Sequence, residues 1–351
     1  MTVDENKLTE LMAKVVGDMG AASSGVLVII GDRLGLFAAI AEKGPLSSRR
    51  LAEITGTRER MVREWLAAMS ASEYVTYDPA TEYYKMTPEQ AALLANPDSP
   101  FFVASVFPTI AALYKDEPLV SAAFRHGRGV GWNEHDVDLF HGTERFFGHV
   151  YEHFMVHAWL PSLENVVEKL TRGGNIADIG CGHGASTLLM ARSFPESSFS
   201  GFDSHAESIH LARQRMKEAG LKNVTFQQCA ARSVPPGNYD LVVFLDSFHE
   251  MGDPVGIAGH VRDILSPDGT LMLVEQKAAD RLEDNLHPAG RMGYSFSTMI
   301  CVPGAISQGE EDALGAQAGL SRLAGVLQAG GFTRIRKTSE TPFHMVIEAK
   351  R

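Results

Sequence analysis

A glycine-rich segment in the second half of the chain carries the residues best suited to bind a small ligand. The run from Asp178 to Gly184, DIGCGHG, ends a short apolar stretch and leads directly into a helical pattern. Gly180, Gly182 and Gly184 allow tight turns and close approach of a ligand, and the helix start supplies free N–H groups. Similar loops bind nicotinamide dinucleotides, so this segment alone leaves the cofactor open.

Polar residues farther along the chain indicate which class of cofactor this segment binds. Asp203 closes the next apolar stretch, 23 residues after Gly180, where a carboxylate can accept both hydroxyls of a ribose. The spacing GxGxG differs from the dinucleotide pattern GxGxxG and is less suited to a pyrophosphate. Asp246 and His249 follow another strand-like run, at the edge where ligands bind in open α/β sheets. These features favour a cofactor with a ribose, no diphosphate and a polar amino-acid end, which describes S-adenosylmethionine.

Short apolar runs that alternate with helical patterns are expected to position these residues. Such alternation predicts a parallel sheet with helices on both faces. The last two strands have no helix between them and should form an antiparallel hairpin. The predicted fold class is therefore α/β, a Rossmann-like sheet of seven strands with the last one antiparallel. The predicted strands are 175–180, 198–203, 224–229, 239–246, 270–276, 332–338 and 344–350, with helices at 185–193, 205–219, 254–265 and 320–329.

The first half of the chain is predicted to be mostly helical and to contain a winged helix. Helices over 8–42 precede a helix-turn-helix pattern, in which Gly56 makes the turn, and two short strands follow. The residues of this unit are 47–71 for the helix pair, with strands at 74–77 and 83–86. Helical sequence continues to about residue 165, which gives predicted domains at 1–165 and 166–351.

Composition limits the partners and the compartment. The chain has 351 residues, 44% of them hydrophobic, and a net charge of −11, which opposes electrostatic binding to nucleic acid or to an anionic membrane. Residues 47–63 hold five arginines against two glutamates, a mild local +3. Three cysteines without a CxxC pair, no signal-peptide layout, and an apolar run of only six residues at 25–30 predict a cytoplasmic protein with no membrane partner.

Six stretches resemble the class I S-adenosylmethionine-dependent methyltransferases. The similarity is to the bacterial branch with an N-terminal winged-helix domain, which includes uncharacterised mycobacterial members. In small-molecule methyltransferases of this kind the N-terminal domain forms a homodimer and walls off the active site. The stretches are ADIGCGHGAST (177–187), GFDSHAESI (201–209), YDLVVFLDSFHEMGDP (239–254), LSPDGTLMLVE (265–275), NLHPAGRMGYSFSTMICVP (285–303) and ALGAQAG (313–319).

The resemblance implies roles for individual residues around the cofactor. Asp178 and the three loop glycines should line the methionine and ribose part, and Asp203, with Ser204 beside it, should bind the ribose hydroxyls. This sequence lacks the acidic residue that many relatives carry beside the adenine, which leaves backbone contacts there. The residues expected beside the adenine are Cys229, Ala230 and Ala231, and those expected to flank the methionine are Asp246 and Phe248.

His249 is the candidate general base, because an imidazole titrates near neutral pH. The alternative is that it orients substrate or makes a structural hydrogen bond. Glu250 fits a helix-start or surface acid. Glu275 fits either a group that positions substrate or a hydrogen-bonded strand end.

An insertion at 281–316 is expected to cover the cofactor as a lid. Within it, Arg291 and Tyr294 are candidates for binding an acidic or polar substrate, since an arginine can grip a carboxylate with two hydrogen bonds. The alternative is a structural ion pair of Arg291 with Glu283 or Asp284.

Three histidines recur every four residues at 149, 153 and 157, a spacing that can chelate a metal. No remote cysteine or carboxylate completes such a site, so we predict no metal. We expect instead that this helix faces the cleft and that Tyr151 and His153 contact substrate.

The sequence thus predicts a homodimeric enzyme that methylates a small molecule at O, N or S. A specific variant is a thioether S-methyltransferase, such as the methylthiohydroxybutyrate enzymes of dimethylsulfoniopropionate synthesis, which would need carboxylate anchoring and no base. The alternative from another class is a winged-helix transcriptional regulator that binds the cofactor without turnover.

Overall fold

The computed structural model describes residues 3–309 and 312–351 and separates into two compact units. The first comprises 1–114 with 137–149, and the second comprises 115–136 with 150–351. The units interleave because helices α6 (Phe107–His126) and α7 (Val137–Phe154) each begin in the first unit and end in the second. The sequence, in contrast, predicts a single boundary near residue 165.

The first unit confirms the predicted winged helix. Ser47 caps α3 through a bond from the backbone N–H of Arg50, and Gly56 ends this helix with a φ of 65°. The ring of Phe37 packs edge-on against Trp65 in the core. The elements are α1 (Glu5–Arg33), α2 (Leu36–Lys43), α3 (Ser48–Thr55), α4 (Glu59–Ala71), β1 (Thr76–Asp78), β2 (Tyr83–Lys85), α5 (Pro88–Leu94) and η1 (Ala104–Val106).

Helix α1 presents apolar side chains to solvent along much of its length. Leu8, Met12, Val15, Met19 and Val26, spaced by three, four or seven residues, are between 43% and 64% exposed. The helix has 29 residues and contains an 18-residue stretch with a mean hydropathy of 1.5, of which 11% is buried. By length and composition alone, such a helix could cross a membrane. The sequence-based expectation considered only the six-residue run at 25–30, whereas in the structure this run is the end of a longer apolar helix.

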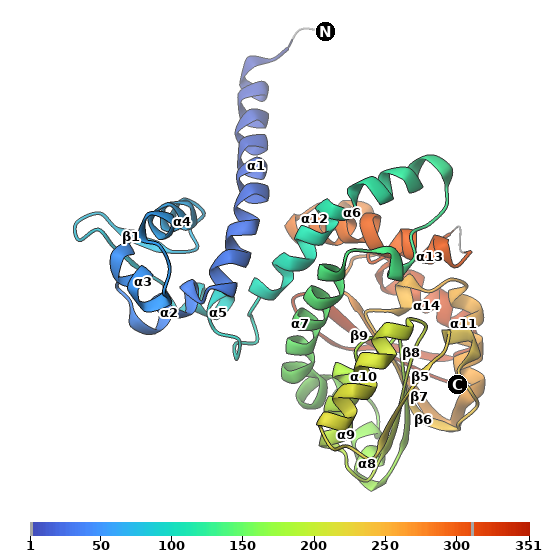
Figure 1. Cartoon of the computed structure of the whole chain (residues 1–351). Helices are drawn as coiled ribbons and strands as arrows, with labels where there is room; N and C mark the ends of the chain where they lie inside the picture. Colours follow the sequence, from blue (N-terminus) through green and yellow to red (C-terminus); the bar gives the residue numbers. More distant parts are fainter. Residues whose placement is uncertain (1–2, 310–311) are drawn as a thin grey trace. The chain divides into compact units, whose positions relative to one another are not determined.

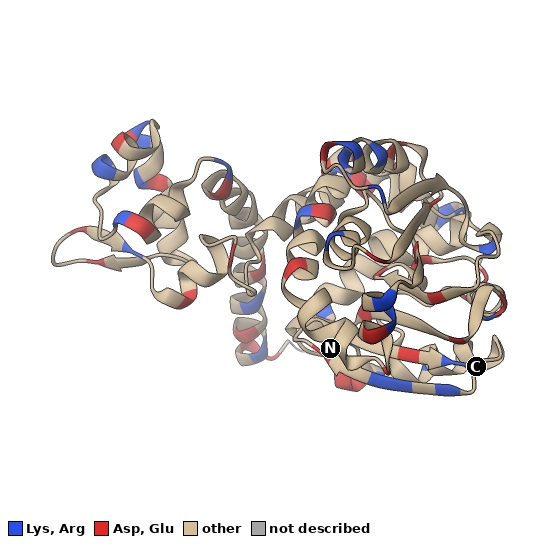
Figure 2. Cartoon of the chain, turned by 90° about the horizontal axis from the view of Figure 1, so that it is seen from below, with Lys and Arg blue, Asp and Glu red and all other residues tan. Residues whose placement is uncertain are grey.

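The arginines of the winged helix lie beside acids rather than forming a basic face. Arg50 pairs with Glu53, and in α4 Arg63 pairs with Glu59 and Arg60 with Glu64. In Figure 2, blue and red segments accordingly alternate along the helices of this unit. Three of the five arginines counted in the sequence are therefore held in ion pairs, one of them with Glu64, which lies just beyond the counted segment.

The second unit is built on a seven-stranded sheet of order β5-β4-β3-β6-β7-β9-β8, as Figure 1 shows with helices on both of its faces. The first five of these strands are parallel, and β9 is antiparallel to both β7 and β8, which confirms the predicted fold class. The strands are β3 (Asn175–Ile179), β4 (Ser198–Asp203), β5 (Val224–Gln228), β6 (Tyr239–Leu245), β7 (Leu265–Gln276), β8 (Arg334–Glu340) and β9 (His344–Lys350).

Helices connect these strands close to the predicted positions. Within the predicted lid, four short helices occupy 282–307. Helix α8 (Val166–Arg172) precedes the first strand of the sheet, and the helices between strands are α9 (Ala185–Ser193), α10 (Ala206–Glu218), α11 (Pro254–Ile264) and α14 (Gly319–Ala329). The shorter elements are η2 (Trp132–Glu134), η3 (Met155–Trp159), η4 (Leu160–Ser162), η5 (Ala231–Ser233), η6 (Phe248–Glu250), η7 (Leu282–Asn285), α12 (Pro288–Phe296), η8 (Ser297–Cys301) and α13 (Val302–Ser307).

The sheet reverses its strand order between β3 and β6, which lie side by side at its centre. The sequence makes these strands almost continuously apolar, and every residue from Leu241 to Leu245 is buried. A parallel strand covered on both faces needs such a composition. The carboxyl ends of β3 and β6 therefore form the crevice in which open α/β sheets bind ligands.

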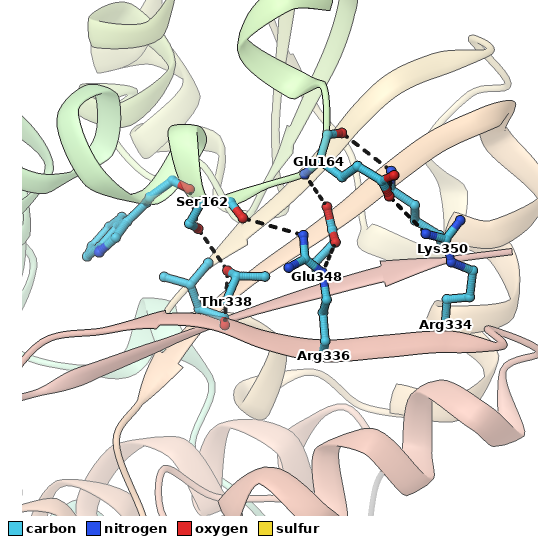
Figure 3. A network of polar contacts seen from close by, with 9 residues as sticks. Ser162, Glu164, Arg334, Arg336, Thr338, Glu348 and Lys350 are labelled. Carbon is cyan, nitrogen blue, oxygen red and sulfur yellow. Dashed lines mark hydrogen bonds and ion pairs between the residues drawn. The ribbon is translucent and has the colours of Figure 1, made fainter.

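A polar network fastens the segment after η4 to the terminal hairpin (Figure 3). The buried Glu348 carboxylate accepts hydrogen bonds from the backbone N–H of Glu164 at 2.8 Å and from Nε of Arg336 at 2.5 Å. The hydroxyls of Ser162 and Thr338 are 2.8 Å apart. This network fixes the chain that precedes α8 against the β8–β9 edge.

Candidate active site

The glycine loop after β3 is shaped as the sequence predicts. Gly180, Gly182 and Gly184 have φ values of 77°, 52° and 82°, in the left-handed region that favours glycine. A Cβ at Gly180 would lie 2.7 Å from the Ser247 hydroxyl, and one at Gly184 would lie 2.6 Å from the Phe226 ring, so neither position accepts a side chain. Gly182 faces open space instead. The loop thus leaves room beside Gly182 for a ligand to meet the backbone.

Asp203, at the end of β4, turns its carboxylate toward this loop. Its two oxygens accept hydrogen bonds from the backbone N–H of Gly182 at 2.9 Å and of His205 at 2.8 Å. Burial raises the pKa of Asp203, and the two backbone hydrogen bonds oppose that shift. Ser204 next to it is exposed. A carboxylate fixed by the loop itself is in position to accept the hydroxyls of a sugar.

Asp178 is the most deeply buried acid of the crevice. Its Oδ2 accepts hydrogen bonds from the hydroxyls of Ser186 and Thr187, each at 2.7 Å, while its Oδ1 has no partner among the described residues. Burial raises the pKa of Asp178 to about 6, against the two hydroxyl bonds, which lower it. An orphaned, buried carboxylate oxygen costs free energy unless a ligand donates to it.

Asp246 follows β6 in a strained conformation, with a φ of 50°. The Nε2 atom of His344 lies 3.2 Å from its Oδ2, yet neither oxygen has a hydrogen-bond partner of good geometry in the described chain. Strain at a non-glycine residue is often retained where function requires it. A second acceptor therefore faces the crevice beside Asp178.

Phe248, which the resemblance places beside the methionine part of the cofactor, lies in the core of the second unit. It is completely buried and packs edge-on against Phe244 in the core below the sheet edge. The hydrophobic effect explains the inward orientation of this ring. Its role is to support the turn that carries Asp246 and His249.

His249 and Glu275 form a buried pair at the ends of β6 and β7. The ring nitrogen Nδ1 of His249 hydrogen-bonds the Oε2 atom of Glu275, and each side chain is only 2% exposed. Burial disfavours the charged imidazolium, but the carboxylate of Glu275 outweighs this cost, and the pKa of His249 stands well above that of free imidazole. The carboxylate orients the ring and leaves its other nitrogen, Nε2, without a hydrogen-bond partner in the described structure. The expectation of a hydrogen-bonded strand-end acid at Glu275 is confirmed.

Two further side chains complete the surroundings of His249. The Oε1 atom of Glu250 lies 3.8 Å from Nε2, and burial raises the pKa of this acid. Cys301, at the end of η8, is buried, and burial raises the pKa of its thiol to about 12. Sequence reasoning missed Cys301 because it comes from a helix 52 positions away, with no local motif to signal it.

The predicted substrate residues fall into two groups. Tyr151 is buried, and its pKa is raised first by burial and then by the nearby carboxylates of Asp246, Asp178 and Glu275, which places its hydroxyl at the same acidic centre. His153 is half-buried on the same helix.

The other substrate candidates lie in the insertion. On α12, Arg291 is exposed and Tyr294 is half-buried. Glu283, one of the acids considered for an ion pair with Arg291, pairs with Arg281.

The histidine repeat is not one continuous face. His149 Nε2 lies 2.6 Å from the carbonyl oxygen of Ser99, and its ring packs against Phe102. His157 lies in the π-helical turn η3, which breaks the four-residue spacing.

The residues expected beside the adenine follow β5 as one segment. The backbone N–H of Cys229 bonds the Asp203 carbonyl at 2.8 Å. Cys229 is half-buried, Ala230 is exposed and Ala231 is buried.

Comparison with known proteins identifies both halves of the chain. Residues 170–319 match the methyltransferase domain family, and residues 22–96 match the Rv2258c-like winged HTH domain family. The chain contains a class I S-adenosylmethionine-dependent methyltransferase domain behind a winged helix-turn-helix domain. The cofactor of this methyltransferase domain is S-adenosylmethionine.

Solved structures share the methyltransferase fold over the full chain. Human N-acetylserotonin methyltransferase in complex with SAM superposes with a TM-score of 0.69 at 16% identity, covering 100% of this chain and 99% of that one. An O-methyltransferase family protein from Burkholderia thailandensis superposes with a TM-score of 0.68 at 16% identity, again covering 100% and 99%. At this identity the likeness shows the fold alone.

Among curated relatives, the malonyl-[acyl-carrier protein] O-methyltransferase of a Paenibacillus strain is 29% identical over 117 residues. That match covers 31% of this chain and 42% of the relative, so the chain spans less than half of the length of that enzyme. The similarity lies in the methyltransferase domain and does not fix the acceptor.

Proposed function

We propose that this protein transfers a methyl group from S-adenosylmethionine to a hydroxyl group of a small molecule. The observation that carries the proposal is a set of buried polar atoms at one sheet edge that have no hydrogen-bond partner among the described residues: Oδ1 of Asp178, both oxygens of Asp246, Oε1 of Glu275 and Nε2 of His249. The carboxylate oxygens accept hydrogen bonds, and the imidazole nitrogen accepts one in its unprotonated form, so a ligand that donates hydrogen bonds would satisfy this set.

The chain's own residues fit the cofactor. Asp178 Oδ1 would accept from its ammonium group, and the Asp203 carboxylate would accept from its ribose hydroxyls. The open side of Gly182 accommodates its close approach. When bound, S-adenosylmethionine supplies an electrophilic methyl group on a sulfonium.

His249 is the residue that would remove the proton from the acceptor hydroxyl. Glu275 holds the Nδ1–H of the imidazole, so that Nε2 presents its lone pair toward the crevice and can take the proton from an acceptor hydroxyl as its oxygen gains the methyl group. The bond to Glu275 also stabilises the imidazolium that forms.

The charges around His249 support an acceptor that donates hydrogen bonds. Glu250 and Glu275 place carboxylates beside it, whereas Arg291 is exposed on α12. A carboxylate-bearing thioether would meet repulsion here. The geometry therefore favours the hydroxyl-methylating enzyme over the thioether S-methyltransferase.

The test is untargeted labelling. A cell extract is incubated with the purified chain and methyl-labelled cofactor, and the labelled metabolite is isolated and identified. We expect a small hydroxylated acceptor to gain label, and His249→Ala to abolish most of that label. Label on a thioether, retained in His249→Ala, would overturn the base role, and no labelled product together with tight cofactor binding would favour the regulator without turnover.

We further propose a cytoplasmic homodimer formed through the first unit. Its support is the exposed apolar face of α1, in which Leu8, Met12, Val15, Met19 and Val26 recur at the spacing of a helix-pairing seam. Sedimentation equilibrium should give twice the chain mass of 38.2 kDa. A monomer that floats with lipid vesicles would instead support a membrane role for α1.

A further inference from the structure

His249, Glu250 and Cys301 bring three different metal-binding atoms together beside the crevice. One nitrogen, one carboxylate oxygen and one sulfur from these residues all lie within 4.8 Å of one another. The set does not come from one motif, because η6 supplies the first two residues and η8 supplies the third. Imidazole, thiolate and carboxylate are the ligand types of zinc sites.

A second observation points to a ligand at this place. Nε2 of His249 is buried, with the side chain 2% exposed, and it has no hydrogen-bond partner in the described chain. The other ring nitrogen is bound to Glu275. A histidine that ligates a metal through one nitrogen almost always gives its other N–H to a carboxylate or carbonyl, which fixes the ring and makes the ligating nitrogen more basic. The His249–Glu275 pair already has this arrangement.

We propose that His249 Nε2, Cys301 Sγ and a Glu250 oxygen bind a zinc ion. Three protein ligands leave a fourth tetrahedral position for water or another small ligand. Because bond lengths to zinc are about 2.0–2.3 Å, the three atoms must end about 3.5 Å apart. Small rotations of the Glu250 and Cys301 side chains close that gap, since the His249–Glu250 distance is already 3.8 Å.

Binding balances as an exchange of protons for the metal. The thiol of Cys301 loses its proton to the buffer and ligates as thiolate, and any proton on His249 Nε2 or on the Glu250 carboxyl leaves to the buffer in the same way, so that these groups ligate as imidazole and carboxylate. The side chain of Glu250, 27% exposed, is the part of the cluster that reaches solvent and gives the ion a way in.

The consequence for catalysis rests on the proposed function. A zinc ion on Nε2 occupies the lone pair that would accept the substrate proton. The metal-bound protein is therefore inactive as a hydroxyl methyltransferase, and a chelator restores it. The cluster is then an inhibitory metal site rather than a catalytic one.

Cobalt(II) gives a readout that does not depend on activity. The full chain is first freed of metal with a chelator and then titrated with cobalt(II) under reducing conditions. We expect saturation at one equivalent, a thiolate-to-cobalt charge-transfer band in the near ultraviolet, and loss of the cobalt spectrum when one equivalent of zinc is added. Absence of the thiolate band from the wild-type chain would overturn the proposal.

Two cysteine variants locate the site. Cys301→Ala should lose the band, whereas Cys229→Ala, which removes a half-buried cysteine that is not in the cluster, should keep it. A Cys301→Ala chain that keeps the band, with a native circular dichroism spectrum, would refute the assignment.

A third variant covers the case in which Cys301→Ala does not fold. Glu250→Gln should keep the thiolate band but weaken cobalt binding by about tenfold or more. Unchanged cobalt affinity in this variant would refute the role of Glu250. Cobalt binding without any methyl transfer would support the metal site and contradict only the proposed function. Methyl transfer that zinc does not inhibit would support the proposed function and contradict the inhibitory metal site.

Discussion

Cofactor binding is expected to weaken as the pH falls from 7 to 5, because protons compete with the cofactor for Asp178. Burial holds the pKa of this carboxyl at about 6 in the empty site, above its ordinary value of 3.8. A cofactor ammonium group at Oδ1 favours the carboxylate and therefore binds only the deprotonated form well. With a pKa of about 6, the dissociation constant at pH 5 is about tenfold larger than at pH 7.

Two variants separate Asp178 from other groups that titrate in this range. Asp178→Asn should weaken binding by about 10- to 100-fold, since a hydrogen bond to a charged group contributes about 1.5–3 kcal/mol, and should remove the pH dependence. Ser186→Ala deletes a hydrogen bond that favours the carboxylate. It should therefore raise the pKa of Asp178 and move the loss of affinity to a higher pH.

The assay is calorimetric titration with S-adenosylhomocysteine, which keeps the amino-acid end of the cofactor, at half-unit steps between pH 5 and 7. Affinity that is constant over this range in the wild-type chain would refute the reasoning. So would an Asp178→Asn chain that keeps the same pH dependence.

Three further outcomes follow from the structure. His249→Ala should lower kcat by about 10²- to 10⁴-fold while leaving the affinity for S-adenosylhomocysteine unchanged, and an equal loss of both would point to a structural role. In urea unfolding, Glu348→Ala should lower the stability of the second unit by about 1–3 kcal/mol, because a backbone N–H and a guanidinium lose their buried acceptor. Glu164→Ala removes the ion pairs of a carboxylate that is itself 44% exposed and should cost less than about 1 kcal/mol, and the reverse order would contradict this account. Met19→Glu should convert the dimer to a monomer in sedimentation runs, and an unchanged dimer would exclude the α1 face as the interface.

The elements could be predicted from the sequence where local signals coincide. The run from Asn175 to Ile179 is apolar, lies between glycines and ends on the loop, and its strand and the following helix at 185–193 are found where predicted. Asp178, the loop glycines and Asp203 could be predicted for the same reason. Strand ends and glycine spacing are recognisable from neighbouring residues in the sequence.

Features that depend on tertiary packing could not be predicted in this way. The pairing of His249 with Glu275 joins the ends of two adjacent strands, and Cys301 reaches them from the insertion. Phe248 has the same local context as its polar neighbours, and only the packing below the sheet shows that it turns inward. The division into compact units cannot be seen in the sequence, because α6 and α7 are each continuous helices that pass from one unit to the other.

The most direct test of the central claim compares two ligands on the same crevice. Full-length protein is titrated by calorimetry with S-adenosylhomocysteine and, separately, with a nicotinamide dinucleotide, and both titrations are repeated on Asp203→Ala. The account predicts one S-adenosylhomocysteine per chain, a large loss of that affinity in the variant, and no heat from the dinucleotide. Binding of the dinucleotide with no response to S-adenosylhomocysteine would contradict it.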